Sequence, residues 1–206
     1  SGLCLGGEII SFQGELTQGS LILGVVEPGY EVRHKGERLK LASSGHFLVG
    51  LGRDSSSIME VSLVSPDGDM STHRFGVEKR LYNVQRVDGV PQRTVSPSNI
   101  DMARIKRDVR VVKKARETMY EKAYYLDGFT MPIEGPITGV YGSQRIYNGV
   151  PKSPHYGVDY AALTGTIVRA PAAGVITMAE RDLFYSGGTL IMDHGHRLTS
   201  SFLHLS

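Results

Sequence analysis

The sequence has few of the features that mark disulfide-rich, membrane-spanning or nucleic-acid-binding proteins. Cys4 is the only cysteine among the 206 residues, which excludes a disulfide within the chain and a cysteine-based zinc site. No apolar run approaches the roughly 18 residues that a membrane-spanning helix needs. The net charge of +2 is too small to indicate nucleic-acid binding by itself. The remaining composition, 40% hydrophobic and 21% charged, is that of a chain able to form a folded core.

The start of the chain lacks both an initiator methionine and a hydrophobic signal core, so we expect it to be trimmed or processed. Cys4, close to this start, is a candidate for lipid attachment. The preceding Leu3 disfavours that role, because such sites carry a small residue there. An ordinary thiol is therefore the favoured interpretation, and lipid attachment stays open.

Residues 8–80 have the pattern of short β-strands. Apolar residues recur in runs such as 21–26, 47–49 and 58–64, and glycine-containing turn signals separate these runs. Evenly spaced strands with such turns predict an antiparallel β-sandwich-like accessory domain. The three histidines of this segment are scattered, so we expect no catalytic site there.

Residues 81–127 are predicted to form an extended connector followed by a helix. Ser98, with Asp101 three residues later, predicts the helix start as a weak capping box. The helix is expected to run from about Asn99 to Tyr124. One apolar stripe follows from spacings of three, four and seven residues: Met102, Ile105, Val109, Val112 and Met119.

The other faces of this predicted helix are basic, through Arg104, Lys106, Arg107, Arg110, Lys113, Lys114 and Arg116. A solvated surface is the favoured interpretation, and contact with an anionic surface or polymer is the alternative. Since no aromatic residues interleave with these charges, we expect no nucleic-acid partner.

From residue 128 to residue 206 the sequence is rich in glycine and proline, with short β-prone pieces between them, and predicts a second β domain. Within it, His155 and Asp159 lie four residues apart. Pro154 and Gly157 argue against a helix at this position.

An extended segment would place His155 and Asp159 on one face and a second, apolar face in the core. That second face consists of Tyr156, Val158 and Tyr160. Imidazole and carboxylate are both good zinc ligands. On spacing alone, however, a plain hydrogen-bonded pair is the commoner outcome, so both interpretations stay open.

The order of the motifs in residues 129–206 resembles the lysostaphin-like zinc metallopeptidases of family M23, the LytM-domain family. That family has a His-x-Gly-x-Asp motif, which His155 to Asp159 match. It continues with a Gly-Thr-x-Val-x-Ala stretch, an Asp-His-Gly strand end and an aromatic-x-His-Leu-Ser element. These correspond to Gly165 to Ala170, Asp193 to Gly195 and Phe202 to Ser206. The aromatic-Gly-x-Arg-like element near the start of the domain corresponds to 141–145.

The resemblance implies a mainly β fold with a Gly-rich antiparallel peptidase domain, and it implies bound Zn2+. His155 and Asp159 would be zinc ligands. His204 would be one of two catalytic histidines that do not bind the metal. Arg145 and Asn148, just before His155, are candidates for substrate binding, although a loop-packing role fits them equally well.

The family's last motif, His-x-His, supplies the third ligand and the other catalytic histidine, and the sequence ends before any such motif. We therefore expect an incomplete site with poor metal affinity in this chain. His194 and His196 also have His-x-His spacing. Their Asp-His-Gly context favours a structural turn over a metal site.

The resemblance further implies a zinc endopeptidase that cleaves peptide cross-links of bacterial peptidoglycan, in a periplasmic or extracytoplasmic location. The alternative is an inactive LytM-type regulator that binds and activates other cell-wall hydrolases. A third idea is a folded scaffold in which the sandwich domain is a glycan-binding module.

Overall fold

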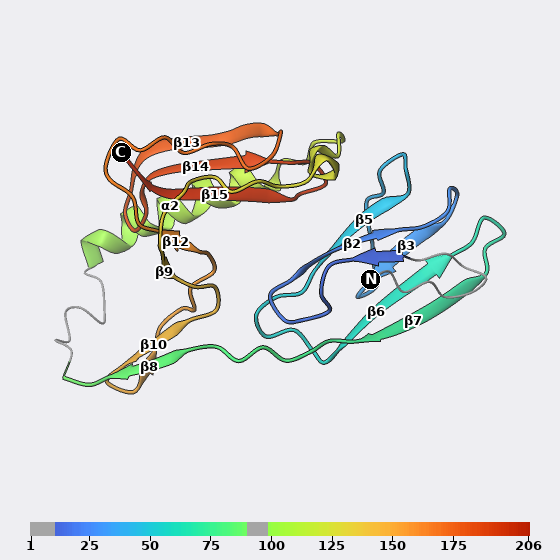
Figure 1. Ribbon diagram of the computed structural model, residues 1–206, viewed down its shortest axis with the longest axis horizontal. Helices are drawn as coiled ribbons and strands as arrows, with labels where there is room; N and C mark the ends of the chain where they lie inside the picture. Colours follow the sequence, from blue (N-terminus) through green and yellow to red (C-terminus); the bar gives the residue numbers. More distant parts are fainter. Residues whose placement is uncertain (1–10, 90–98) are drawn as a thin grey trace. The chain divides into compact units, whose positions relative to one another are not determined.

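The computed structural model describes residues 11–89 and 99–206 (Figure 1). The chain divides into two compact units, one that ends at Tyr82 and one that begins at Asn83. The predictions on Cys4 and on the Ser98 cap lie outside the described residues. In the described part of the chain, no helix is long and apolar enough to cross a membrane.

The first unit consists of two antiparallel sheets. One has the order β1-β2-β5 and the other the order β4-β3-β6-β7. The strands of the first sheet are β1 (Ser11–Gln13), β2 (Leu21–Val25) and β5 (His46–Gly50). Those of the second are β3 (Glu31–His34), β4 (Glu37–Arg38), β6 (Ile58–Val64) and β7 (Met70–Gly76).

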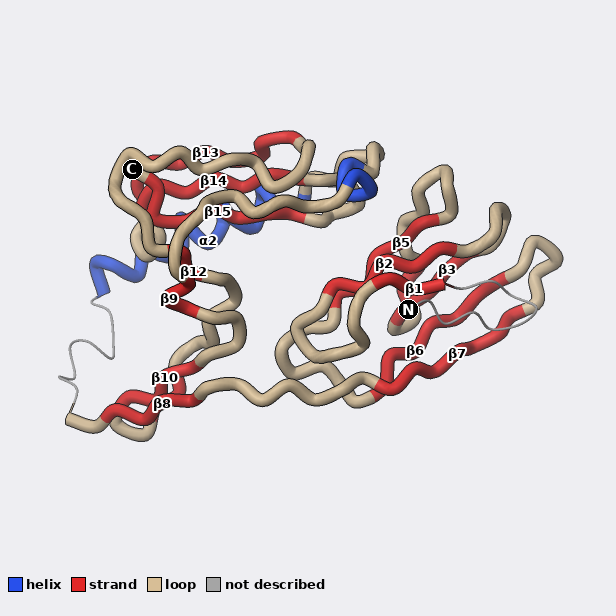
Figure 2. The backbone as a smooth tube through the Cα atoms, viewed as in Figure 1, coloured by secondary structure: helices blue, strands red, loops and turns tan. Residues whose placement is uncertain are grey.

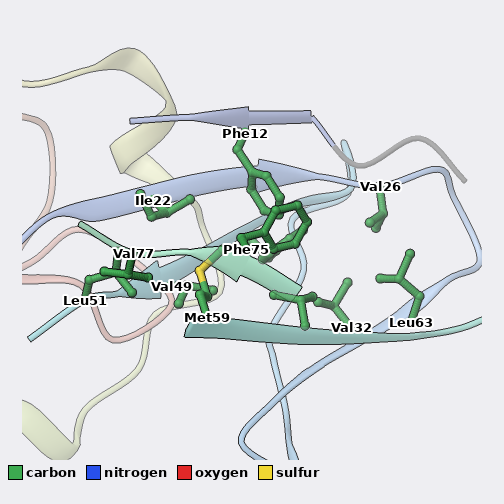
Figure 3. Close-up of a cluster of buried hydrophobic side chains, with 12 residues drawn as sticks. Phe12, Ile22, Val26, Val32, Val49, Leu51, Met59, Leu63, Phe75 and Val77 are labelled. Carbon is green, nitrogen blue, oxygen red and sulfur yellow. The ribbon is translucent and has the colours of Figure 1, made fainter. Parts of the chain in front are cut away.

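Side chains from both sheets form one core, which confirms the predicted sandwich. On β6 every second side chain is buried, as expected for a strand with one face on the core. Phe12 of β1 meets Phe75 of β7 edge-on, with ring centroids 4.8 Å apart (Figure 3). Phe47 of β5 is fully buried beneath Gly24, where a β-carbon would overlap the Phe47 ring.

The second unit contains an antiparallel sheet β13-β14-β15, a two-stranded sheet β12-β9 and a sheet β11-β10-β8. Between β9 and β13 most of the chain is loop (Figure 2). The strands are β8 (Val84–Val87), β9 (Ile137–Gly139), β10 (Gln144–Tyr147), β11 (Val150–Pro151), β12 (Asp159–Tyr160), β13 (Val175–Leu183), β14 (Gly187–Asp193) and β15 (Thr199–Leu205). The helices are α2 (Asn99–Glu117) and the short 3-10 helix η1 (Tyr124–Asp127).

One pairing departs from the antiparallel domain that the sequence predicts. β8 belongs to the predicted extended connector, and it pairs in parallel with β10. The register places Val84 opposite Gln144 and Val87 opposite Tyr147. The connector is therefore part of the second unit.

Helix α2 ends at Glu117, earlier than the predicted end at Tyr124. The chain after it bonds to a distant turn instead of continuing the helix. Tyr120 O accepts from the backbone N–H of His196 at 3.0 Å, and the Tyr125 N–H donates to His194 O at 3.2 Å. These long-range bonds replace the helical ones.

The buried face of α2 also differs from the predicted stripe. Ala115 packs with Val111 and Val112 against side chains of β13 and β14, namely Met178, Leu183 and Ile191. Val109, expected in the stripe, is 60% exposed, and Asp108 is buried beside it. Val112 of the predicted stripe therefore packs as expected, whereas the buried position expected for Val109 is taken by Asp108.

Asp108 is buried because it bonds to the turn after β13. Its Oδ2 accepts from the backbone N–H of Phe184 at 2.8 Å, and its Oδ1 accepts from Arg107 at 3.0 Å. The Phe184 N–H, with further help from Arg107 and Arg104, holds the pKa of Asp108 below its ordinary value of 3.8, although burial acts in the opposite direction.

Asp108→Asn should lower the melting temperature of the protein at neutral pH, because the Phe184 N–H loses a charged acceptor. A lowered folded-state pKa stabilises the protein above pH 3.8, and that stabilisation is lost as the pH falls through the folded-state value. Thermal melts of both proteins between pH 2 and 7 check this. The difference in melting temperature should stay level above about pH 5 and shrink as the pH falls further. A difference independent of pH would contradict the electrostatic role.

Candidate metal centre

His155 and Asp159 meet directly, as the sequence predicts. His155 Nε2 lies 3.1 Å from Asp159 Oδ1, and the two side chains are 33% and 58% exposed. The backbone conformation differs from the predicted one, because an extended segment would separate the α-carbons of His155 and Asp159 by roughly 13 Å. Only Asp159 and Tyr160 are in a strand, and the chain bends at Gly157. The bend brings the two side chains together.

The second predicted face of this segment is not buried. Tyr156 is 65% exposed and Val158 is 45% exposed. Tyr156 meets Tyr141 edge-on, with ring centroids 6.2 Å apart. Because residues 154–158 leave strand geometry, the two-residue alternation no longer sorts their side chains onto opposite faces.

The backbone N–H and the backbone carbonyl of His155 both bond to a turn at residues 142 and 143. The His155 N–H donates to Ser143 O at 2.8 Å, and the Gly142 N–H donates to His155 O at 2.7 Å. These bonds fix the backbone from which the imidazole projects.

The ring of His155 is oriented by Val140. Its Nδ1 lies 3.2 Å from the Val140 carbonyl oxygen. A carbonyl can only accept, so the proton sits on Nδ1 and, in the neutral ring, Nε2 presents a lone pair to the Asp159 carboxylate. Two acceptors at 3.1 Å repel each other unless a proton or a cation lies between them. Histidines that bind metals commonly donate their other ring N–H in this way.

The spacing of the two acceptors fits zinc. Tetrahedral zinc with nitrogen and oxygen ligands at about 2.0–2.2 Å separates neighbouring ligand atoms by about 3.3 Å. The observed distance of 3.1 Å between His155 Nε2 and Asp159 Oδ1 is close to this ligand–ligand separation. Among the residues that the structure describes, no group of three or more His, Cys, Asp or Glu side chains is placed to hold a metal ion. In the described residues, the candidate metal centre therefore consists of His155 and Asp159 alone.

His204 lies on a different sheet, in a β-bulge of β15. Leu190 pairs with Phe202 and Gly188 pairs with Leu205, so Leu203 and His204 stand opposite the single residue Thr189. The bulge gives His204 a φ of 59°, and its N–H donates to Ser186 O at 2.8 Å. Bulges next to active sites commonly redirect a side chain, and a left-handed backbone is unfavourable for a residue with a β-carbon.

Asn148 and Gly149 form the two-residue loop that joins β10 and β11. Their φ values are 49° and 78°, and a type I′ hairpin turn requires positive φ at both positions. Asn-Gly is the pair that such turns prefer, so the turn explains Asn148. Arg145 of β10 is exposed, and its Nη1 lies 3.5 Å from the Tyr147 hydroxyl. A role of either residue in substrate binding stays a prediction.

His194 and His196 have the structural roles that their context predicts. His194 is fully buried, with Nδ1 2.7 Å from Ala173 O and Nε2 2.8 Å from Ser200 Oγ. His196 lies with Nδ1 3.0 Å from the Tyr125 hydroxyl and Nε2 3.0 Å from Glu121 O. Because protein groups contact both nitrogens of both rings, neither histidine presents a nitrogen for a metal.

Replacing His204 tests whether its backbone is held in an unfavourable conformation. His204→Gly should be more stable than His204→Ala by about 1 kcal/mol, because glycine adopts positive φ without steric penalty. Chemical denaturation followed by circular dichroism measures the difference. A matched pair, Leu203→Gly and Leu203→Ala, should show the opposite order, because Leu203 lacks a positive φ. Equal stability of the two His204 variants would contradict the bulge geometry.

A known protein family matches the last part of the chain. The model of peptidase family M23 matches residues 153–206, which include His155, Asp159 and His204 but neither Arg145 nor Asn148. No curated protein matches the chain. The match confirms the resemblance predicted from the motifs, and residues 153–206 thus carry a segment of the M23 peptidase type.

Proposed function

We propose that this chain is part of a zinc-dependent endopeptidase that cleaves peptide cross-links of bacterial cell-wall peptidoglycan. The observation that carries the proposal is the convergence of His155 Nε2 and Asp159 Oδ1, 3.1 Å apart, within a segment that matches a peptidase family. The family match supports a peptidase in general terms. The metal, the peptidoglycan substrate and a periplasmic or extracytoplasmic location are the further steps of the proposal.

His155 and Asp159 would hold the metal, with the Val140 carbonyl fixing the tautomer and direction of the His155 ring. A zinc ion held by these two residues would supply Lewis acidity and would lower the pKa of a bound water toward about 7. His204, exposed on its bulge, would transfer a proton or donate a hydrogen bond to the developing oxyanion. The 33% and 58% exposure of the two ligand side chains leaves room for a peptide to approach.

Peptidoglycan digestion tests this function. Purified peptidoglycan treated with the natural protein that contains this chain should release cross-link peptides, and a chelator should stop the release until zinc is restored. His155→Ala should lower the rate at least 100-fold, because it removes a ligand. His34→Ala, which changes a histidine of the first unit, should cleave like the unchanged protein.

The inactive LytM-type regulator is the second candidate, and activity assays separate it from the peptidase. Such regulators have lost site residues of the family motif, whereas His155, Asp159 and His204 are all present in this chain. If the natural protein releases nothing under any metal condition but raises the rate of another wall hydrolase, the regulator is correct and the peptidase proposal fails.

A further inference from the structure

We infer that Gly139 is a positioning residue for the metal ligand Asp159, which it serves by lacking a β-carbon. The inference rests on the proposed metal function of the His155–Asp159 pair. It assigns a role to β9, a strand that carries no metal-binding side chain.

Gly139 and Asp159 are direct partners across the β9–β12 ladder. The Asp159 side chain lies over the backbone of Gly139. A β-carbon built on Gly139 would overlap Asp159 Oδ2 and would lie 2.8 Å from Cγ and 3.1 Å from Cβ of the same residue. The three nearest atoms all belong to Asp159, so a side chain at position 139 would displace this carboxylate before anything else.

The two carboxylate oxygens of Asp159 therefore have different neighbours. Oδ2 occupies the space over Gly139, and Oδ1 faces His155 Nε2 at 3.1 Å. A methyl group at position 139 would push Oδ2 out of its place and turn the carboxylate about its χ angles. Oδ1 would then lose its direction toward the His155 ring.

The next residue of the chain orients the other ligand. Val140 follows Gly139 directly, and its carbonyl oxygen accepts the Nδ1–H of His155 at 3.2 Å. Two consecutive residues therefore direct both members of the pair, Gly139 by leaving space and Val140 by a hydrogen bond. Neither contact involves a side chain of β9, which is why the sequence motif alone does not reveal them.

The backbone conformation does not require glycine at this position. Gly139 does not have a positive φ, whereas thirteen other glycines in the described chain do. Alanine could adopt the same backbone, and glycine inside a strand is unfavourable because it packs no side chain. The space that the Asp159 carboxylate fills is thus the reason for glycine here.

Gly139→Ala in the natural protein that contains this chain tests the inference, with zinc affinity measured by titration calorimetry. We expect the affinity to fall by about 10- to 100-fold, the range typical of residues that orient metal ligands. The matched control is Gly50→Ala. Gly50 also lacks positive φ, and a β-carbon there meets no atom within 4 Å, so its zinc affinity should not change. Unchanged affinity in Gly139→Ala would overturn the inference.

A thermal double-mutant cycle separates this inference from the proposed function, because it needs no metal. Gly139→Ala should lower the melting temperature of the metal-free protein but not that of Asp159→Gly, which lacks the displaced side chain. An equal decrease in both backgrounds would show that alanine disturbs the strand itself, and would overturn the inference. If the unchanged protein binds no zinc, the proposed metal function fails, and the cycle alone decides whether Gly139 positions Asp159.

Discussion

The candidate site of the second unit depends on one local constraint, the direct approach of the His155 ring to the Asp159 carboxylate. The Val140 carbonyl accepts from His155 Nδ1, and this directs His155 Nε2 toward Asp159 Oδ1, 3.1 Å away. The surrounding chain maintains this approach by a bend at Gly157, by two backbone bonds to residues 142 and 143, and by the space over Gly139.

The rest of the unit is a scaffold with its own polar interactions. The β13–β14–β15 sheet rests on α2 through a small apolar cluster and through Asp108, whose carboxylate bonds to the Phe184 N–H. At the other end of β14, Asp193 and His194 are fully buried, and Asp193 Oδ1 accepts the Gly195 N–H at 2.6 Å. The basic residues of α2 are partly used inside this scaffold. Arg104 pairs with Asp182 at 2.7 Å, which supports the interpretation of that face as structural and solvated.

The sequence predicts what local pattern and motif order determine. Two-residue alternation in 8–80 predicts the sandwich, and the order of motifs after residue 128 predicts the family that matches residues 153–206. The predicted contact between His155 and Asp159 is present, but a bend at Gly157 produces it and the predicted extended segment does not. The loop role that the sequence allows for Asn148 is also local in origin, because Asn-Gly is a strong signal for a two-residue hairpin turn.

The errors arise where distant partners decide the structure. Asp108 takes a buried position on α2 because Phe184, 76 residues away, supplies a backbone donor. The helix stops at Glu117 because the following residues bond to the turn at His194 and His196. The parallel β8–β10 pair and the contact between Gly139 and Asp159 likewise join residues far apart in sequence. Neither periodicity nor a motif encodes such pairings.

The most direct test of the account is the state of His155 Nε2, because a metal ligand and an ion-paired imidazolium differ at this atom. Nitrogen-15 NMR of the histidine rings, recorded at neutral pH in the natural protein that contains this chain, distinguishes them. On addition of zinc we expect the His155 Nε2 signal to move to the range of a metal-bound nitrogen while Nδ1 keeps its proton. A His155 ring that carries protons on both nitrogens and does not respond to zinc would show an ordinary ion pair, and would contradict the metal centre.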